Sequence, residues 1–114
     1  MRAFSVLSLV SILALAGCSG GGKTPDQVAG TWGADCSSPF VKFSGDTIHV
    51  YPDDEDYDIK SSNLNGDTFI VSYDSKAGPV TENYVIENGM LRLDKGTYAG
   101  VEAVWHKQPM KKCD

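Results

Sequence analysis

The sequence has few of the residues from which catalytic and metal centres are built. It contains two histidines, His49 and His106, and its three cysteines are isolated, with no Cys-x-x-Cys pair. Within residues 24–114 no Ser lies in a Gly-x-Ser-x-Gly elbow, and no pair of carboxylates stands out from the acidic background. A zinc site needs several ligands at suitable spacing, and a serine nucleophile needs an adjacent base. We therefore expect no enzyme, no metal site and no cofactor, and we expect both histidines to be structural.

Basic charge and long apolar segments are scarce as well. Ten Lys and Arg residues stand against 15 Asp and Glu residues, which gives a net charge of −5. Binding to nucleic acid depends on neutralising phosphates, so we expect no nucleic-acid partner, whereas an acidic surface favours a basic one. The apolar run Ala3–Ala16 is shorter than the stretch of about 20 residues that crosses a bilayer. It follows Arg2 and ends in small residues, which is typical of an export signal.

The end of this run carries the motif Leu15-Ala16-Gly17-Cys18. All four positions resemble the lipobox of bacterial lipoproteins, and an ordinary secretory signal is the alternative. The resemblance implies cleavage before Cys18, a diacylglyceryl group on its thiol and acylation of the new amine. Several acyl chains, each contributing roughly 0.8 kcal/mol per buried methylene, would hold the protein firmly on a membrane.

The residues after Cys18 define a tether and a domain. Asp at the next position retains lipoproteins of enteric-type bacteria in the inner membrane, so Ser19 implies transport to the outer membrane, facing the periplasm. Residues 18–23 are rich in Gly and Ser, which is typical of a flexible tether. Without residues 1–17, which include one arginine and no acid, 97 of the 114 residues remain and the net charge becomes −6. That length suits a single β domain over residues 24–114, and we expect a monomer.

Two cysteines remain once lipid takes Cys18. Cys36 and Cys113 are an even pair in an exported protein, where disulfides persist. We predict that they form a disulfide, with two free thiols as the alternative. Such a bridge closes nearly the whole domain and would stabilise it by about 4 kcal/mol in the loop-entropy model.

Short β-type segments separated by turn-forming residues fill the predicted domain. The predicted strands are Val28–Gly33, Phe40–Phe43, Thr47–Tyr51, Tyr57–Leu64, Thr68–Tyr73, Val80–Ile86, Met90–Leu93 and Val101–His106. Hairpin signals such as Asn65-Gly66 and Asn88-Gly89 join them. Alternating apolar and polar residues give each strand one buried face. Eight such strands favour a small antiparallel up-and-down barrel, because closure removes exposed edges, and a two-sheet β-sandwich is the alternative.

Two segments near the start of the domain carry further signals. Thr24–Gln27 (Thr-Pro-Asp-Gln) fits a capping box and predicts one short helical turn. Gly30–Trp32 (Gly-Thr-Trp) resembles the start of lipocalin-like small barrels, in which the Trp plugs one end. This resemblance implies an apolar ligand inside the barrel. The alternatives are a Trp that merely packs in the core and an interior filled by the protein's own side chains.

The densest charge cluster is Asp53-Asp54-Glu55-Asp56. It predicts a solvated hairpin tip that protects a sheet edge, or an acidic docking surface for a basic enzyme. A calcium loop is disfavoured, because Ile59 stands where the sharp turn needs Gly and no glutamate follows at the required distance.

The segment Asp94–Gly100 is predicted to be a loop between two strands. It presents Lys95, Gly96, Thr97 and Tyr98 without an apolar pattern. Tyr on a rigid scaffold gives a large contact area at low entropy cost, so we expect these four residues to bind a partner. An ordinary connecting loop is the alternative.

The lipobox, the small β-barrel and the two widely spaced cysteines resemble the membrane-bound inhibitors of C-type lysozyme. That family blocks its enzyme with loop residues that include a Ser-Gly pair followed by a Tyr. Gly96 and Tyr98 match this pattern loosely and the serine is missing. Trp105 is followed by a short basic tail, where that family has a further strand. The resemblance implies an inhibitor of, or immunity protein against, a cell-wall lytic enzyme.

The sequence thus predicts a lipid-anchored periplasmic protein that acts by binding. In the most concrete version, an acidic domain attracts a basic peptidoglycan hydrolase and fills its cleft. The alternatives are a lipocalin-like carrier of a small apolar ligand and a structural envelope lipoprotein without a ligand. An apolar cavity in the fold would favour the carrier.

Overall fold

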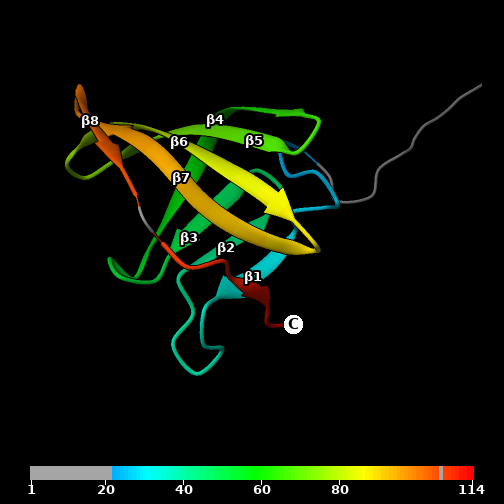
Figure 1. Ribbon diagram of the computed structural model, residues 1–114. Coiled ribbons are helices and arrows are strands. Elements are labelled where there is room, and N and C mark those ends of the chain that lie inside the picture. Colours follow the sequence, from blue (N-terminus) through cyan, green and yellow to red (C-terminus); the bar gives the residue numbers. More distant parts are fainter. Residues whose placement is uncertain (1–21, 106) are drawn as a thin grey trace, which may run out of the picture.

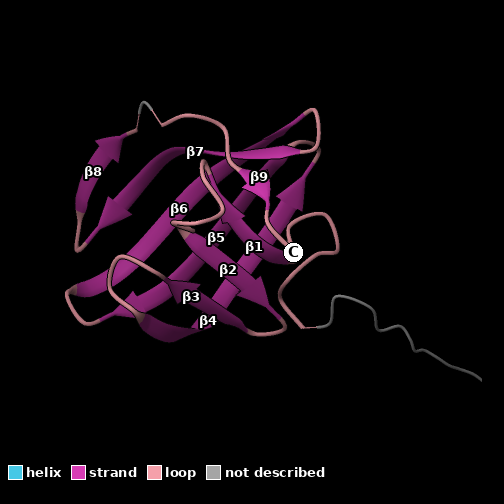
Figure 2. Ribbon diagram, turned by 90° about the horizontal axis from the view of Figure 1, so that it is seen from below, coloured by secondary structure: helices cyan, strands magenta, loops and turns pink. Residues whose placement is uncertain are grey.

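The computed structural model describes residues 22–105 and 107–114. Within them, nine antiparallel strands form one sheet that curls into a barrel, and no segment is helical (Figures 1 and 2). The strands are β1 (Gly30–Gly33), β2 (Val41–Ser44), β3 (Thr47–Val50), β4 (Glu55–Asn65), β5 (Thr68–Ser75), β6 (Gly78–Glu87), β7 (Met90–Tyr98), β8 (Val101–Val104) and β9 (Lys111–Lys112). Their order in the sheet is β8-β7-β6-β5-β4-β3-β2-β1-β9. The predicted all-β, up-and-down architecture is confirmed, and the two-sheet sandwich does not form.

Two-residue turns join several neighbouring strands, as the hairpin signals predicted. Residues 45–46, 66–67 and 88–89 form these turns between paired strand ends. In the β6–β7 turn, Asn88 and Gly89 have φ angles of 53° and 76°. A type I′ turn needs positive φ at both central residues, and its twist matches that of the flanking strands.

Inward-facing side chains fill the middle of the barrel. Along β5, Phe69, Val71 and Tyr73 are buried, as their alternation predicted. The ring of Phe43 meets the rings of Phe69 and Tyr84 edge-on, with centroids 5.4 and 5.5 Å apart. Aromatic pairs in this arrangement stabilise a fold by about 0.5–1.5 kcal/mol each beyond their burial. The central layer of the barrel is therefore well packed.

The segment before β1, blue in Figure 1, crosses the end of the barrel away from β8. The backbone N–H groups of Val28 and Ala29 both donate to the Pro25 carbonyl at 3.0 Å, so this segment forms a hydrogen-bonded turn and not a helix. The predicted capping box was wrong, because the buried Thr24 hydroxyl has no hydrogen-bond partner. Trp32 is buried, and its Nε1–H donates to the Val28 carbonyl at 2.8 Å. We call this region, from Thr24 to Trp32, the plugged end.

The C-terminal segment closes the barrel wall. β9 pairs with β1 (Figure 2), and Met110 exchanges backbone hydrogen bonds of 2.9 and 2.7 Å with Leu91 of β7. The predicted disulfide between Cys36 and Cys113 is present and holds this segment in place. The sequence predicted only a basic tail here, so β9 was missed. No helix in the described part of the chain is long and apolar enough to cross a membrane.

Candidate functional site

The predicted loop Asp94–Gly100 is mostly strand, so that prediction was wrong. β7 continues to Tyr98 before the chain turns into β8. The cause is a β-bulge: one step along β6, the paired residue on β7 changes from Leu93 to Lys95, which leaves Asp94 as the extra residue. The alternation of β7 is interrupted there, and the sequence pattern consequently read as a loop.

The bulge changes which side chains of β7 face the interior. Leu93 before it is buried, whereas beyond it Gly96 is buried and Tyr98 is half-buried. Lys95 and Thr97 lie exposed on the outer face. A Cβ atom at position 96 would lie 2.5 Å from the Tyr98 hydroxyl oxygen. Gly96 therefore gives the ring of Tyr98 room to fold over β7 into the barrel.

Tyr98 belongs to a cluster around a buried carboxylate that the sequence reasoning missed. Glu82 on β6 is only 5% exposed. Its Oε1 accepts hydrogen bonds from the hydroxyls of Tyr73 (3.2 Å) and Tyr84 (3.1 Å), and its Oε2 accepts one from Tyr98 (2.7 Å). The Nε1–H of Trp105 donates to the Tyr98 hydroxyl at 2.8 Å. We call these five residues the Glu82 cluster.

A signal for this cluster is present in the sequence. Glu82 lies between Val80 and Tyr84 at the period-two spacing that marks the buried face of β6. A carboxylate at such a position is unusual, because Glu is almost never fully buried without a partner. Tyr84 is two residues away on β6, whereas Tyr73 and Tyr98 come from the neighbouring strands β5 and β7, which local patterning does not reveal.

Burial dominates the electrostatics of the Glu82 cluster. It raises the pKa of Glu82 above the ordinary value of 4.5, while the three tyrosine hydrogen bonds act in the opposite direction. Burial, together with the nearby Glu82 carboxylate, also raises the pKa values of Tyr73, Tyr84 and Tyr98. Within residues 22–105 and 107–114, no cationic side chain makes an ion pair with Glu82.

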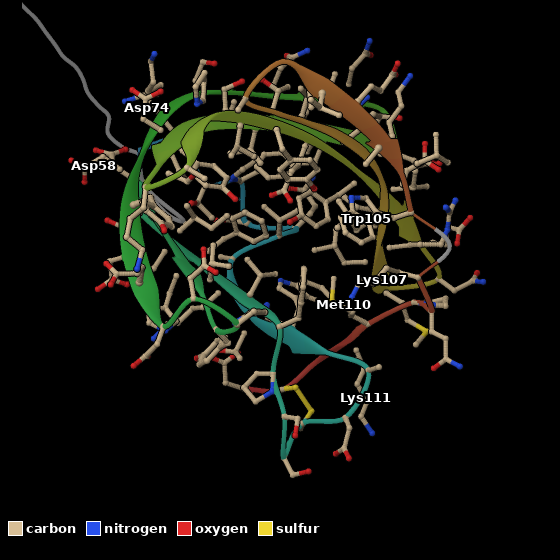
Figure 3. The ribbon with its side chains drawn as sticks, turned by 90° about the vertical axis from the view of Figure 1, so that its left-hand side faces the viewer. Asp58, Asp74, Trp105, Lys107, Met110 and Lys111 are labelled. Atoms are coloured by element: carbon tan, nitrogen blue, oxygen red, sulfur yellow. A yellow bond between two sulfur atoms is a disulfide. The ribbon has the colours of Figure 1, made fainter. Side chains whose placement is uncertain are left out.

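A pocket of about 320 Å³ opens beside the Glu82 cluster. Apolar side chains such as Phe40, Val50 and Val80 form much of its wall, and Trp105 contributes an indole. Figure 3, which looks into the ring of strands, shows Trp105 directed inward. The polar groups of Glu82 and of its neighbouring tyrosines complete the lining. We call this region the pocket end.

Only Asp53 and Asp54 of the predicted acidic tip lie in the turn between β3 and β4, because Glu55 and Asp56 already belong to β4 and pair with Val50 and His49 of β3. Asp53 is exposed and also lines the pocket, where the Tyr57 hydroxyl donates to it at 3.3 Å. Asp54 and Asp56 instead lie 3.5 and 2.7 Å from the ring nitrogens of His49. Of the two sets of predicted partner-binding residues, the fold thus brings Asp53 and Tyr98 to one pocket.

The remaining predicted residues lie elsewhere. Glu55 is 3.5 Å from the ammonium of Lys76, and His49 lies on the outer face with its ring against Tyr51. Asp58 and Asp74 also point outward (Figure 3). In the described part of the chain, no group of three or more His, Cys, Asp and Glu residues is arranged to hold a metal ion. Cys18, the leader before it and His106 lie outside the described residues.

The barrel is consequently asymmetric. Its plugged end is packed around Trp32, while its pocket end combines an accessible space with a buried acid. Comparison with known proteins assigns neither end a role. No family model, no curated protein and no solved structure matches the chain.

Proposed function

We propose that the chain is a lipid-anchored envelope protein that binds a small, largely apolar ligand at the pocket end. The observation that carries this proposal is a space of about 320 Å³ in a barrel whose interior is otherwise packed. Ligand sites typically measure about 300–1,000 Å³, with mostly apolar walls and a few polar groups that orient the ligand. A ligand of one or two rings would suit the lower end of that range.

The path of the chain supports this role. The described chain begins at the turn between β2 and β3, where the backbone N–H of Lys23 donates to Asp46 at 2.9 Å. Val50, at the opposite end of β3, lines the pocket. A tether attached through Cys18 would therefore join the barrel at the end opposite the pocket. The pocket would then stay accessible from the periplasm.

The proposal is tested by screening small neutral molecules against the full chain carrying Cys18→Ser, so that no lipid competes for them. Ligand-observed NMR with 2-phenylethanol and related one-ring probes should give saturable binding. Ala77→Trp should abolish it, because Ala77 lies exposed at the pocket and the indole would fill the space. Thr97→Trp, on the exposed outer face of β7 and outside this pocket, is the control and should leave binding unchanged. Absence of saturable binding by every probe would contradict the proposal.

A second proposal is inhibition of, or immunity to, a basic peptidoglycan hydrolase. The side chains of Asp54, in the turn between β3 and β4, and of Asp56, near the start of β4, are 92% and 71% exposed, which supports attraction of a basic partner. Lys95 and Thr97 lie exposed on a different strand. Inhibition of lysozyme or another hydrolase should then weaken with salt and with Asp54→Asn plus Asp56→Asn. Inhibition that does not respond to either change would contradict this version.

A further inference from the structure

We infer that the ligand of the pocket is a protonated amine with an aromatic or aliphatic body, whose ammonium group binds the carboxylate of Glu82. This inference rests on the proposed function, because it names the class of molecule that the pocket takes. Three independent features of the pocket end support it. They are an open hydrogen-bond acceptor position on Glu82, the acidic charge of the residues that line the pocket, and the aromatic side chains in its walls.

The carboxylate of Glu82 has room for one more donor. An ionised carboxylate has about four acceptor positions on its two oxygens. Oε1 accepts from Tyr73 and Tyr84, whereas Oε2 accepts only from Tyr98. The open position is therefore on Oε2, and Glu82 is among the residues that line the pocket.

The charged side chains that line the pocket are both acidic. Among the described residues Glu82 and Asp53 line it, and the nearest cation named here, the Lys107 ammonium, lies at the rim against Phe40 and Trp105. A buried carboxylate without a cationic partner is unfavourable, which here raises the pKa of Glu82. A ligand ammonium would supply the missing partner and favour the ionised carboxylate. A ligand carboxylate would meet two acids and would be repelled.

The walls of the pocket suit a cation with an apolar body. Phe40, Tyr73, Tyr98 and Trp105 line the space, and aromatic faces attract cations. The protein already shows this attraction at the rim, where the Lys107 ammonium lies 4.6 Å from the centroid of the Phe40 ring and 5.5 Å from that of Trp105. An amine inside the pocket would contact the same kind of aromatic surface and place its apolar body against Val50 and Val80.

Two probes of matched size test the inference. Phenethylamine and 2-phenylethanol differ mainly in the group that would reach Glu82, and isothermal titration gives their dissociation constants for the full chain with Cys18→Ser. The amine should bind about tenfold more tightly or better at neutral pH, since a hydrogen bond to a charged group is stronger than a neutral one. Phenylacetate should bind more weakly than the alcohol.

Substitutions then identify the residue that causes the preference for phenethylamine over 2-phenylethanol. Glu82→Gln should bring the ratio of the two dissociation constants close to one. Glu87→Gln removes the same charge from an exposed position on the same strand and should leave the ratio unchanged. Asp53→Asn changes an exposed residue outside the Glu82 cluster and should lower the preference for the amine about twofold. This variant keeps the inference testable if Glu82→Gln fails to fold.

The outcomes separate the inference from the function on which it rests. Equal affinities for the amine and the alcohol in the unsubstituted pocket would overturn the inference and leave the proposed ligand binding intact. Tighter binding of phenylacetate would also overturn it. Failure of all three probes to bind, with the disulfide intact, would count against the proposed function itself.

Discussion

The two tryptophans mark two regions of this barrel that are built differently. Trp32 at the plugged end is 2% exposed and donates its N–H to the backbone of Val28. Trp105 at the pocket end is only partly buried and donates to the Tyr98 hydroxyl beside an open space. The comparison teaches that the two indoles play different structural parts: one completes the core, and the other completes the wall of the pocket for which we propose a ligand.

Exchanging each tryptophan for alanine should give the largest contrast. Trp32→Ala should lower the free energy of unfolding by about 4 kcal/mol, because it leaves a cavity in a packed region. Trp105→Ala should cost about 1–2 kcal/mol, since part of its ring is already in contact with water, and it should weaken probe binding. Urea unfolding followed by far-UV circular dichroism measures both. Equal losses of stability would contradict the division of the barrel into two such regions.

The disulfide should stabilise the docking of the C-terminal segment, in which β9 pairs with β1 and Met110 contacts β7. Replacing Cys36 and Cys113 by serine together should lower the free energy of unfolding by about 2–4 kcal/mol, because the unfolded chain gains freedom over a separation of 77 residues. Comparing the oxidised and reduced forms of the natural chain in urea provides an independent measurement. A stability unchanged by reduction would show that β9 stays docked without the bridge.

Gly96 should be more sensitive than its neighbours on β7. Gly96→Ala would place a Cβ atom against the ring of Tyr98, so we expect a loss of about 2 kcal/mol from overpacking and a weaker affinity for probes. Thr97→Ala, on the exposed outer face, is the control and should change stability little. Urea unfolding and probe titration of both variants check this. A neutral Gly96→Ala would mean that Tyr98 can move aside freely.

The pH dependence of stability should give the smallest change and report on Glu82. Its pKa is raised in the fold, so its contribution is fully present below the ordinary value of 4.5 and is lost as the pH rises through the raised value. The stability of the natural chain should therefore fall, relative to that of Glu82→Gln, as the pH rises from the ordinary value of 4.5 through the raised pKa of Glu82. Asp35 and Asp114 have lowered pKa values and act in the opposite direction in both proteins, so they cancel in this difference. A difference that grows in favour of the natural chain with rising pH would contradict the burial of the acid.

Much of the fold could be predicted from local patterns. Alternation and two-residue turns gave the eight main strands, because one buried face and a defined turn leave few other arrangements. β9 could not be found in this way, since Lys111–Lys112 has no apolar alternation and is strand only because β1 offers it a free edge. The pairing of Cys36 with Cys113 followed from counting cysteines in a chain that we expect to be exported, and the pairing is confirmed.

The candidate site was only partly predictable. Tyr98 was expected to bind a partner from an exposed loop, but the bulge at Asp94 turns it inward. The bulge has no clear sequence signal, because it depends on how β7 pairs with β6. Glu82 could have been singled out as an acid on a buried face, yet two of its tyrosine partners, Tyr73 and Tyr98, lie on the neighbouring strands β5 and β7, and their register against β6 cannot be read from the sequence.

The two indole N–H groups allow the most direct test of the central claim that the pocket end binds a ligand while the plugged end is structural. A ¹H–¹⁵N spectrum resolves one indole signal for Trp32 and one for Trp105, since the chain has two tryptophans. Titration with phenethylamine should shift the Trp105 signal to saturation and leave that of Trp32 in place. A Trp105 signal that never moves, or a saturable shift at Trp32 alone, would contradict the account.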